Sequence, residues 1–319
     1  MKTLGGFTMK KAFSLGLLAA FFFSFTFILN SQMNISGGSW VWSASLRYLF
    51  MLPILFIILL LKKEIKPVFK SIKSDPKSWF IWSTVGFGLF YAPLSFASKY
   101  GASWMVASTW QITIIAGALL SPLFFTITIG PNYIAHKRNS IPKKALYFSV
   151  IILIGVFLIQ VQQANNISFS QILFGVIPVI IAAFAYPLGN RKMMDVCNNE
   201  LNTFQRVFSM TLCSLPFWLI LSIFGIVTVG LPSDSQVLQS FLVALFSGVI
   251  ATTLFFKATE LVKGNHHQLA VIEATQAGEV IFTLLGEILI LKTTLPTTIG
   301  YIGIVLVIVG MILNSLFSD

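Results

Sequence analysis

The apolar positions of this 319-residue chain gather in ten long runs, which short polar segments separate. Each run is about 18 to 25 residues long, the length that an α-helix needs to cross the hydrocarbon layer of a bilayer. The fold class that follows is an all-α polytopic membrane protein. The runs predict ten transmembrane helices at 11–30, 40–61, 79–97, 102–126, 145–162, 171–190, 204–228, 237–257, 267–291 and 297–316.

The composition supports this fold class. Hydrophobic residues make up 56% of the chain and charged residues only 10%. A soluble domain has about 25% charged residues, so this chain has too few charged side chains to form a water-exposed surface. We therefore expect the lipid bilayer to surround it. The net charge of +11 does not indicate nucleic-acid binding, since the basic residues lie between the apolar runs, as short cytoplasmic loops require.

The positions of the basic residues predict the orientation. If the N-terminus is cytoplasmic, the inner segments hold nearly all Lys and Arg. The outer loops then hold only Lys99 and Lys292, with Arg47 a little inside the second span. This positive-inside pattern predicts a plasma-membrane protein with both termini in the cytoplasm. The first run resembles a signal peptide, but it lacks a clear small-residue cleavage site, so we interpret it as a retained helix.

The two halves of the chain show a weak internal repeat. The matches keep a common order and nearly constant offset: Asn30 with Asn190, Arg47 with Arg206, KYGAS (99–103) with VKGNH (262–266), TWQI (109–112) with ATQA (274–277), and Gly155 with Gly310. They predict one five-helix repeat at 1–162 and another at 163–319. Because five is odd, the second repeat must be inverted, which is the architecture of many secondary transporters.

The ninth predicted span carries three carboxylates, Glu273, Glu279 and Glu287. Ionisable side chains at membrane depth are costly and therefore indicate function. Helical geometry separates Glu273 and Glu287 by about 40° around the axis and about 21 Å along it, with Gln276 on the same broad face. A carboxyl group in an apolar cavity can exchange a proton for a cationic or polar ligand. Glu279, nearest mid-membrane, is the preferred coupling or substrate site.

Each carboxylate also has a structural interpretation. It could cap a helix end, or it could pair with one of the two arginines at the starts of spans two and seven, Arg47 and Arg206. Their equivalent positions in the two halves favour a structural or gating role for these arginines, together with Asn30 and Asn190, over direct contact with substrate.

Span four supplies candidates for the opposite wall of a cavity. Trp110 and Gln111 could stack on and hydrogen-bond a flat organic ligand, and an aromatic face attracts cations; Thr109 precedes them. The alternative is ordinary helix packing by small and polar residues. Tyr91, Tyr186 and Trp42 are weaker candidates, because aromatic residues near span ends commonly anchor the helix at the membrane interface.

Other chemistry lacks a sequence signature. The chain has no G-x-x-x-x-G-K-[ST] loop for ATP, no G-x-S-x-G elbow and no HExxH motif. His266 and His267 are adjacent, so on a helix their side chains point about 100° apart, a poor arrangement for a shared metal. We therefore expect no enzyme activity, no cofactor and no metal site.

The chain resembles the drug/metabolite transporter superfamily. Members commonly carry Glu-Pro followed fourteen residues later by Gly-Glu; here Glu273 and Gly286-Glu287 keep that spacing, although Ala274 replaces the proline. EATQAGEVIF in span nine and STWQITIIAGALLSP in span four are similar to the ten-helix branch of multidrug resistance efflux transporters. The resemblance implies ten helices and transport. The short four-helix members place their essential glutamate in the first helix, which is uncharged here, so Glu279 would have to substitute.

Together these observations predict a secondary transporter that exports small organic molecules, such as drugs or cationic metabolites, by proton antiport with alternating access. Its partners would be a small-molecule substrate and protons. A second transport interpretation is uptake or exchange of a metabolite of the amino acid or sugar type. From a different class, the chain could be a lipid-linked-sugar flippase accessory or a membrane scaffold without transport of its own. The sequence leaves the oligomeric state open.

Overall fold

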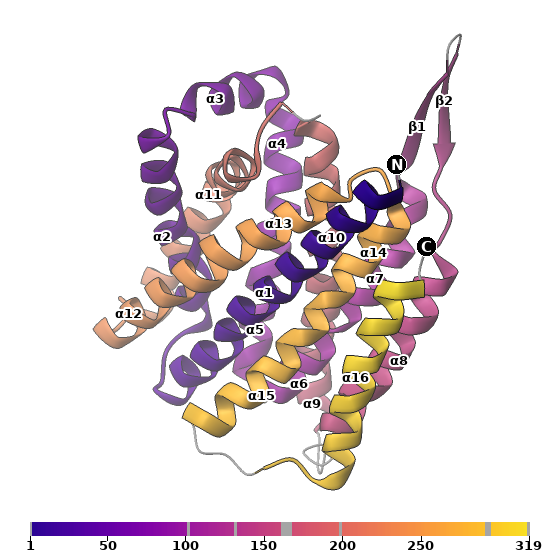
Figure 1. The fold of residues 1–319 in the computed structure, drawn as a ribbon. Helices are drawn as coiled ribbons and strands as arrows, with labels where there is room; N and C mark the ends of the chain where they lie inside the picture. The colour runs from indigo at the N-terminus through magenta and orange to yellow at the C-terminus, as the bar shows by residue number, and fades with distance from the viewer. Residues whose placement is uncertain are drawn as a thin grey trace.

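The computed structural model describes residues 2–100, 103–130, 133–160, 168–197, 200–290 and 295–317. In this part of the chain the backbone is almost entirely helical, and Figure 1 shows the helices packed side by side as one bundle. Nine of the described helices are long and apolar enough to cross a membrane. These helices confirm the coarse prediction of a helical, multi-pass membrane protein.

The nine helices each overlap one predicted span: Thr8–Ile35, Trp40–Leu61, Pro76–Tyr100, Val106–Leu123, Leu173–Cys197, Thr203–Val229, Asp234–Leu261, His266–Gly286 and Thr298–Phe317. The remaining predicted span, 145–162, coincides with an apolar helix of 18 residues, Lys143–Gln160. The total of ten spans and the orientation stay predictions. The predicted boundary between the repeats, 162/163, lies outside the described residues.

The elements of the first half are α1 (Lys2–Ile35), α2 (Trp40–Leu61), α3 (Ile65–Ser74), α4 (Pro76–Ser83), η1 (Thr84–Gly88), α5 (Leu89–Tyr100), α6 (Ser103–Trp110), α7 (Ile112–Leu120), η2 (Ser121–Leu123), β1 (Phe125–Gly130), β2 (Tyr133–Arg138) and α8 (Lys143–Gln160). Those of the second half are α9 (Phe169–Gln171), η4 (Ile172–Val176), α10 (Ile177–Cys197), α11 (Thr203–Val229), α12 (Asp234–Val243), η5 (Ala244–Ala251), α13 (Thr252–Leu261), α14 (His266–Ala274), η6 (Thr275–Ala277), α15 (Gly278–Ile290) and α16 (Thr298–Phe317). The segments η1, η4 and η5 are π-helical, and η2 and η6 are 3-10 turns.

Polar residues fix the starts of several helices. At α11 the Asn202 side chain accepts a hydrogen bond from the backbone N–H of Gln205 (3.0 Å), and the Gln205 side chain accepts one from the backbone N–H of Asn202 (2.8 Å). This reciprocal pair satisfies two N–H groups that the helix itself leaves unbonded. At α4 the hydrogen bonds from Ser78 hold the pKa of the Asp75 carboxyl below its usual range. Asn265 caps α14 through its side chain in a similar way.

Spans four and nine are both interrupted near their middle. α6 ends at Trp110 and α7 begins at Ile112, so Gln111 lies between two helical segments. In span nine the 3-10 turn η6, which contains Gln276, separates α14 from α15. The repeat pairs these two glutamines. Because irregular backbone at membrane depth is tolerated where protein or a cavity surrounds it, both interruptions indicate a polar site inside the bundle.

A two-stranded antiparallel hairpin follows span four, with Phe125 paired to Arg138 and Gly130 to Tyr133. Figure 1 shows this hairpin projecting from the bundle. The apolar runs predict a helix to 126 and a loop at 127–144, so the hairpin differs from the prediction. Thr and Ile alternate in FTITIG, a composition that favours strands. The expectation of an all-α protein is therefore incomplete at this place.

The two halves of the chain make matching helix contacts. α2 packs against α11, and α8 packs against α16, a pair that Figure 1 shows side by side at one edge of the bundle. α1 packs against η5, α13 and α15 of the second half. α10, which the repeat pairs with α1, packs against η1, α5 and α7 of the first half. The contacts of α1 and α10 are therefore similar, as the predicted repeat requires.

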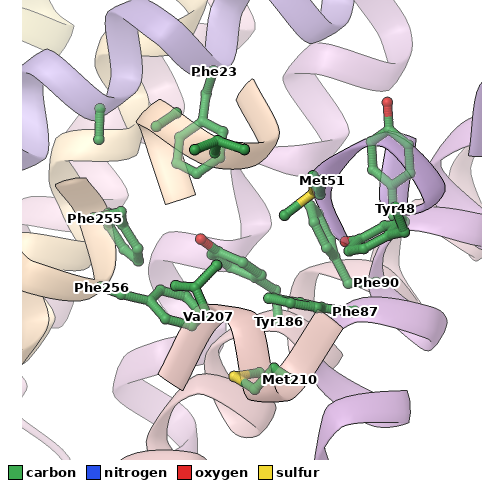
Figure 2. Packing of buried hydrophobic residues seen from close by; sticks show 14 of the residues in the cluster. Phe23, Tyr48, Met51, Phe87, Phe90, Tyr186, Val207, Met210, Phe255 and Phe256 are labelled. Carbon is green, nitrogen blue, oxygen red and sulfur yellow. The ribbon is translucent and has the colours of Figure 1, made fainter. Parts of the chain in front are cut away.

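The core is rich in aromatic residues. Figure 2 shows Phe23 of α1, Tyr186 of α10 and Phe255 of α13 converging within the bundle. The ring centroids of Tyr186 and Phe90 are 4.6 Å apart, and those of Tyr48 and Trp218 are 4.2 Å apart. Many large apolar side chains point outward instead, as along α11, and a lipid environment suits such a surface.

Candidate functional site

A partly open cavity lies within the bundle, with about 260 Å³ of empty space that includes its opening to solvent. Its wall combines aromatic and aliphatic side chains with one cation, one carboxylate and one amide. Both halves of the chain contribute: α1, α2, α5 and α6 from the first, and α10, η6 and α15 from the second. The lining residues are Phe23, Thr26, Phe27, Arg47, Phe90, Leu94, Trp110, Tyr186, Gln276 and Glu279.

The two interrupted spans place polar groups in this cavity. Trp110 is the last residue of α6, Gln276 lies in the turn between α14 and α15, and Glu279 lies in the first turn of α15. Discontinuous helices of this kind commonly form the substrate and ion sites of secondary transporters. Four residues singled out from the sequence, Arg47, Trp110, Gln276 and Glu279, therefore line the same cavity.

Glu279 is the carboxylate of the cavity. Its side chain is 2% exposed, and the indole N–H of Trp110 donates a hydrogen bond to its Oε2 over 3.1 Å. Within the described residues it forms no ion pair. A buried carboxylate with a single neutral donor can take up a proton or a cationic group at low cost, because either neutralises its charge.

Arg47 is the cation of the cavity. It is 1% exposed, its Nη1 donates to the Thr26 hydroxyl over 3.2 Å, and its guanidinium carbon lies 4.1 Å from the Tyr91 ring centroid. The aromatic ring offsets part of the cost of burying the charge. Among the ion pairs of the described chain, none includes Arg47. Arg47 and Glu279 thus line one cavity without pairing.

Several cavity-lining polar atoms have no hydrogen-bond partner in the part of the chain that the structure describes. They are the hydroxyl of Tyr186, both amide atoms of Gln276 and Nε of Arg47. Tyr186 and Gln276 are each 1% exposed, and in Figure 2 the Tyr186 hydroxyl points toward the side of Phe23, another lining residue. Because buried polar groups are nearly always hydrogen-bonded, their convergence on one cavity indicates a binding site for a polar ligand.

Glu273 has a different environment. Arg191 donates to it through Nε (2.9 Å) and Nη2 (2.7 Å), and a third nitrogen lies 3.4 Å from the Ser121 hydroxyl. Both charged side chains are buried, 3% and 1% exposed. Gly117 provides the space, since a Cβ there would lie 1.7 Å from Glu273 Oε2. The pair joins α10, α14 and the end of span four.

The partner of Glu273 is therefore Arg191, and neither Arg47 nor Arg206. The predicted end of span six at 190 puts Arg191 in a cytoplasmic loop. α10 instead continues to Cys197 and carries Arg191 inside the bundle. The sequence does contain one indication of this position of Arg191. It directly follows Asn190, which the predicted repeat places at the inner end of a helix.

Arg206 and the paired asparagines lie outside the cavity lining. Arg206 Nη2 donates to the backbone carbonyl of Phe256 over 3.0 Å, and its guanidinium carbon lies 4.9 Å from the ring of the same residue. Asn30 donates to the Tyr91 hydroxyl (3.2 Å), and Asn190 donates to the Thr259 hydroxyl (3.3 Å). In each half an asparagine at the end of the first helix thus contacts the third helix.

The remaining candidates are not brought together with Glu279. Gln111 is buried and donates to the backbone carbonyl of Ala107 over 3.3 Å, and Thr109 is half-buried; neither lines the cavity. Glu287 belongs to α15, but its side chain lies outside the described part of the chain. The residues searched for metal ligands contain no cluster of His, Cys, Asp or Glu suited to a metal ion.

Comparisons with known proteins identify the family. Residues 10–319 match a family described as "EmrE: Putative multidrug resistance efflux transporter". The chain is 52% identical over 309 residues to "Uncharacterized protein YjlA" of Bacillus subtilis (strain 168), covering 97% of this chain and 95% of that protein. It is 49% identical over 271 residues to "Uncharacterized 42.1 kDa protein in intracellular alkaline protease 3'region" of Shouchella clausii, covering 85% and 70%.

A solved structure described as "Crystal structure of protein" has the same fold. It superposes with a TM-score of 0.70 over 97% of this chain and 98% of that chain, at 11% sequence identity. The similarity extends over both halves, so the complete bundle, including its cavity-lining helices, follows an architecture known from a solved protein.

Proposed function

Because the chain belongs to the EmrE family of multidrug resistance efflux transporters, we propose that it is a secondary active transporter that exports small organic molecules in exchange for protons. The observation that carries this proposal is Glu279, a buried carboxylate that faces a cavity and has Trp110 as its hydrogen-bond donor. The family supports transport of a small molecule. The cavity supplies a site in which such a molecule and a proton can compete.

The exchange requires only the two states of one carboxyl group. With a proton on Glu279 the cavity loses its negative charge and releases a ligand that this charge had held. Without the proton, the carboxylate accepts the hydrogen bond from Trp110 and a further cationic or donor group of the ligand. Tyr186 and Gln276 add neutral hydrogen-bonding atoms, and these atoms have no partner among the described residues. Proton and substrate therefore bind alternately.

The cavity would open alternately to the two sides of the membrane because residues 1–162 and 163–319 form an inverted duplication. In this proposal both termini are cytoplasmic and the protein lies in the plasma membrane. The matching contacts of α1 and α10 support this duplication, as do the interruptions of spans four and nine at paired glutamines. In such proteins the two repeats exchange conformations around a fixed central site, which opens first to one side and then to the other.

The Arg191–Glu273 pair would close the cytoplasmic side. It ties α10 and α14 to Ser121 at the end of span four. In the repeat, Arg191 corresponds to Ser31 and Glu273 to Ser108, and these neutral residues cannot form the same ion pair on the outer side. Opening toward the cytoplasm would have to separate a buried charge pair, whereas opening toward the outside would not.

The test is substrate-dependent proton flux in liposomes that contain the purified protein and a pH-sensitive dye. The substrates are tetraphenylphosphonium, ethidium, L-phenylalanine and N-acetyl-L-phenylalanine. We expect at least one of them to drive proton movement with the native protein, and Glu279→Gln to reduce this flux to the level of protein-free liposomes. The amide keeps the shape of the carboxyl group but cannot exchange a proton.

The matched control is Glu200→Gln, which makes the same change at an exposed carboxylate. This variant should retain native flux. If Glu279→Gln also retains coupled flux, the assignment of Glu279 is wrong. If the native protein moves none of the substrates and no protons, the proposal of export fails.

A further inference from the structure

We propose that the substrates of this cavity carry both a positive and a negative centre on an apolar body. This inference rests on the proposed transport function and specifies its substrate class. It starts from the charges of the cavity wall: one carboxylate, Glu279, and one guanidinium, Arg47, line the same cavity and form no ion pair with each other.

Different helices hold the two charged side chains in position. Arg47 on α2 donates to Thr26 of α1 and lies over the Tyr91 ring. Thr26 in turn donates to the Ser247 hydroxyl of η5 over 2.6 Å, so the side chain that positions Arg47 is itself fixed. Glu279 on α15 is held by Trp110. The two opposite charges are therefore positioned for a third group between them.

A ligand of a single charge fits this wall poorly. A purely cationic molecule would neutralise Glu279 but would lie near the like charge of buried Arg47, which has no ion-pair partner among the described residues. A purely anionic molecule would neutralise Arg47 but would lie near the like charge of Glu279. In a site of low polarity such like-charge contacts are weakly screened. A molecule with an ammonium and a carboxylate group can neutralise both side chains at once, and the orphaned Nε of Arg47 is one donor for that carboxylate.

The rest of the wall defines the body of the ligand. Phe23, Phe27, Phe90 and Leu94 are apolar, and the Trp110 indole presents an aromatic surface. These side chains suit the apolar part of a zwitterion that carries an aliphatic or aromatic group.

The test compares three probes that share one body: L-phenylalanine, which is zwitterionic, L-phenylalanine amide, which is cationic, and N-acetyl-L-phenylalanine, which is anionic. Binding to the purified native protein in detergent is measured by calorimetry. We expect L-phenylalanine to bind at least about tenfold more tightly than either masked probe, because only it neutralises both buried charges. Equal or tighter binding of the amide would overturn the inference.

Two variants locate the preference. Arg47→Gln should shift selectivity toward the amide, and Glu279→Gln should shift it toward the N-acetyl probe. Arg206→Gln is the control, since Arg206 is also a buried arginine but does not line the cavity; it should leave the order of the three affinities unchanged. If Arg47→Gln does not fold, Arg47→Lys, which keeps the charge but loses the guanidinium geometry, should weaken the two carboxylate probes relative to L-phenylalanine amide.

The outcomes separate the two proposals. If tetraphenylphosphonium drives proton flux in liposomes while L-phenylalanine neither binds nor moves, the substrate class is wrong and the exporter remains. If no probe of any charge binds or moves, the transport function fails and this inference fails with it. Tighter binding of L-phenylalanine that is lost in both Arg47→Gln and Glu279→Gln supports both.

Discussion

Glu273 and Glu279 lie in one span and are equally buried, 1% and 2% exposed, yet their surroundings are opposite. Glu273 receives two hydrogen bonds from Arg191, whereas Glu279 receives one from a neutral indole and faces a cavity. A paired carboxylate contributes to the cohesion of the bundle, because losing its partner strands a buried charge. An unpaired one lowers stability, and its presence points to function. The two carboxylates therefore differ in their hydrogen-bond partners and not in their burial.

The largest loss of stability is expected from Arg191→Gln. Removing the guanidinium leaves the Glu273 carboxylate buried without a counter-charge, which typically costs about 3 to 5 kcal/mol. Unfolding in detergent, followed by tryptophan fluorescence, measures the change in free energy. The double variant Arg191→Met/Glu273→Met should recover most of the loss, because it removes both charges together.

The control for this prediction is Lys257→Gln, which breaks the other ion pair of the described chain. Lys257 and Glu260 are 3.3 Å apart, with side chains 45% and 27% exposed. Solvent screens such a pair, so its loss should cost less than about 1 kcal/mol. An Arg191→Gln variant no less stable than Lys257→Gln would show that the buried pair adds nothing to the fold.

A smaller loss is expected from Gly117→Ala. The added Cβ would lie 1.7 Å from Glu273 Oε2, so the carboxylate must move away from Arg191. Overpacking of a close contact typically costs about 1 to 3 kcal/mol. The same substitution in a Glu273→Ala background should cost almost nothing, because the carboxylate that it displaces is absent. An equal cost in both backgrounds would mean that Gly117 is needed for helix packing rather than for the ion pair.

The difference between the two carboxylates could be predicted from the sequence only in part. The apolar runs predict spans that overlap the nine long apolar helices of the described chain. The predicted repeat gives equivalent positions to Gln111 and Gln276. The preference for Glu279 rested on its depth in the span. The Glu273–Arg191 contact joins residues 82 positions apart, and no local pattern specifies such a pairing. From the sequence Tyr186 is only a weaker site candidate, with interfacial anchoring as the alternative, because its neighbours along the chain do not reveal which helices surround it.

Trp110→Phe tests the environment of Glu279 by removing its hydrogen-bond donor. The variant keeps an aromatic wall but removes the N–H that donates to Glu279, so we expect a loss of about 1 kcal/mol in the free energy of unfolding. We also expect weaker transport, since the carboxylate is no longer held in position. Trp42→Phe removes an indole N–H that donates to the Gly230 carbonyl (2.9 Å) and should lower stability similarly without affecting transport. Equal transport in the two variants would exclude a positioning role for Trp110.

The smallest effect on stability is expected from Glu279→Gln, although this variant should lose coupled flux. A neutral amide of the same shape no longer bears the cost of a buried charge, so the free energy of unfolding should stay within about 0.5 kcal/mol of native or rise. Glu273→Gln is the matched change at the paired position, where it strands the Arg191 charge and should cost several times more. Unfolding curves of the two variants, recorded under identical conditions, measure the difference in their free energies of unfolding. If both substitutions destabilise the protein equally, Glu279 is held as firmly by the fold as Glu273, and its proposed exchange between proton and substrate loses its structural basis.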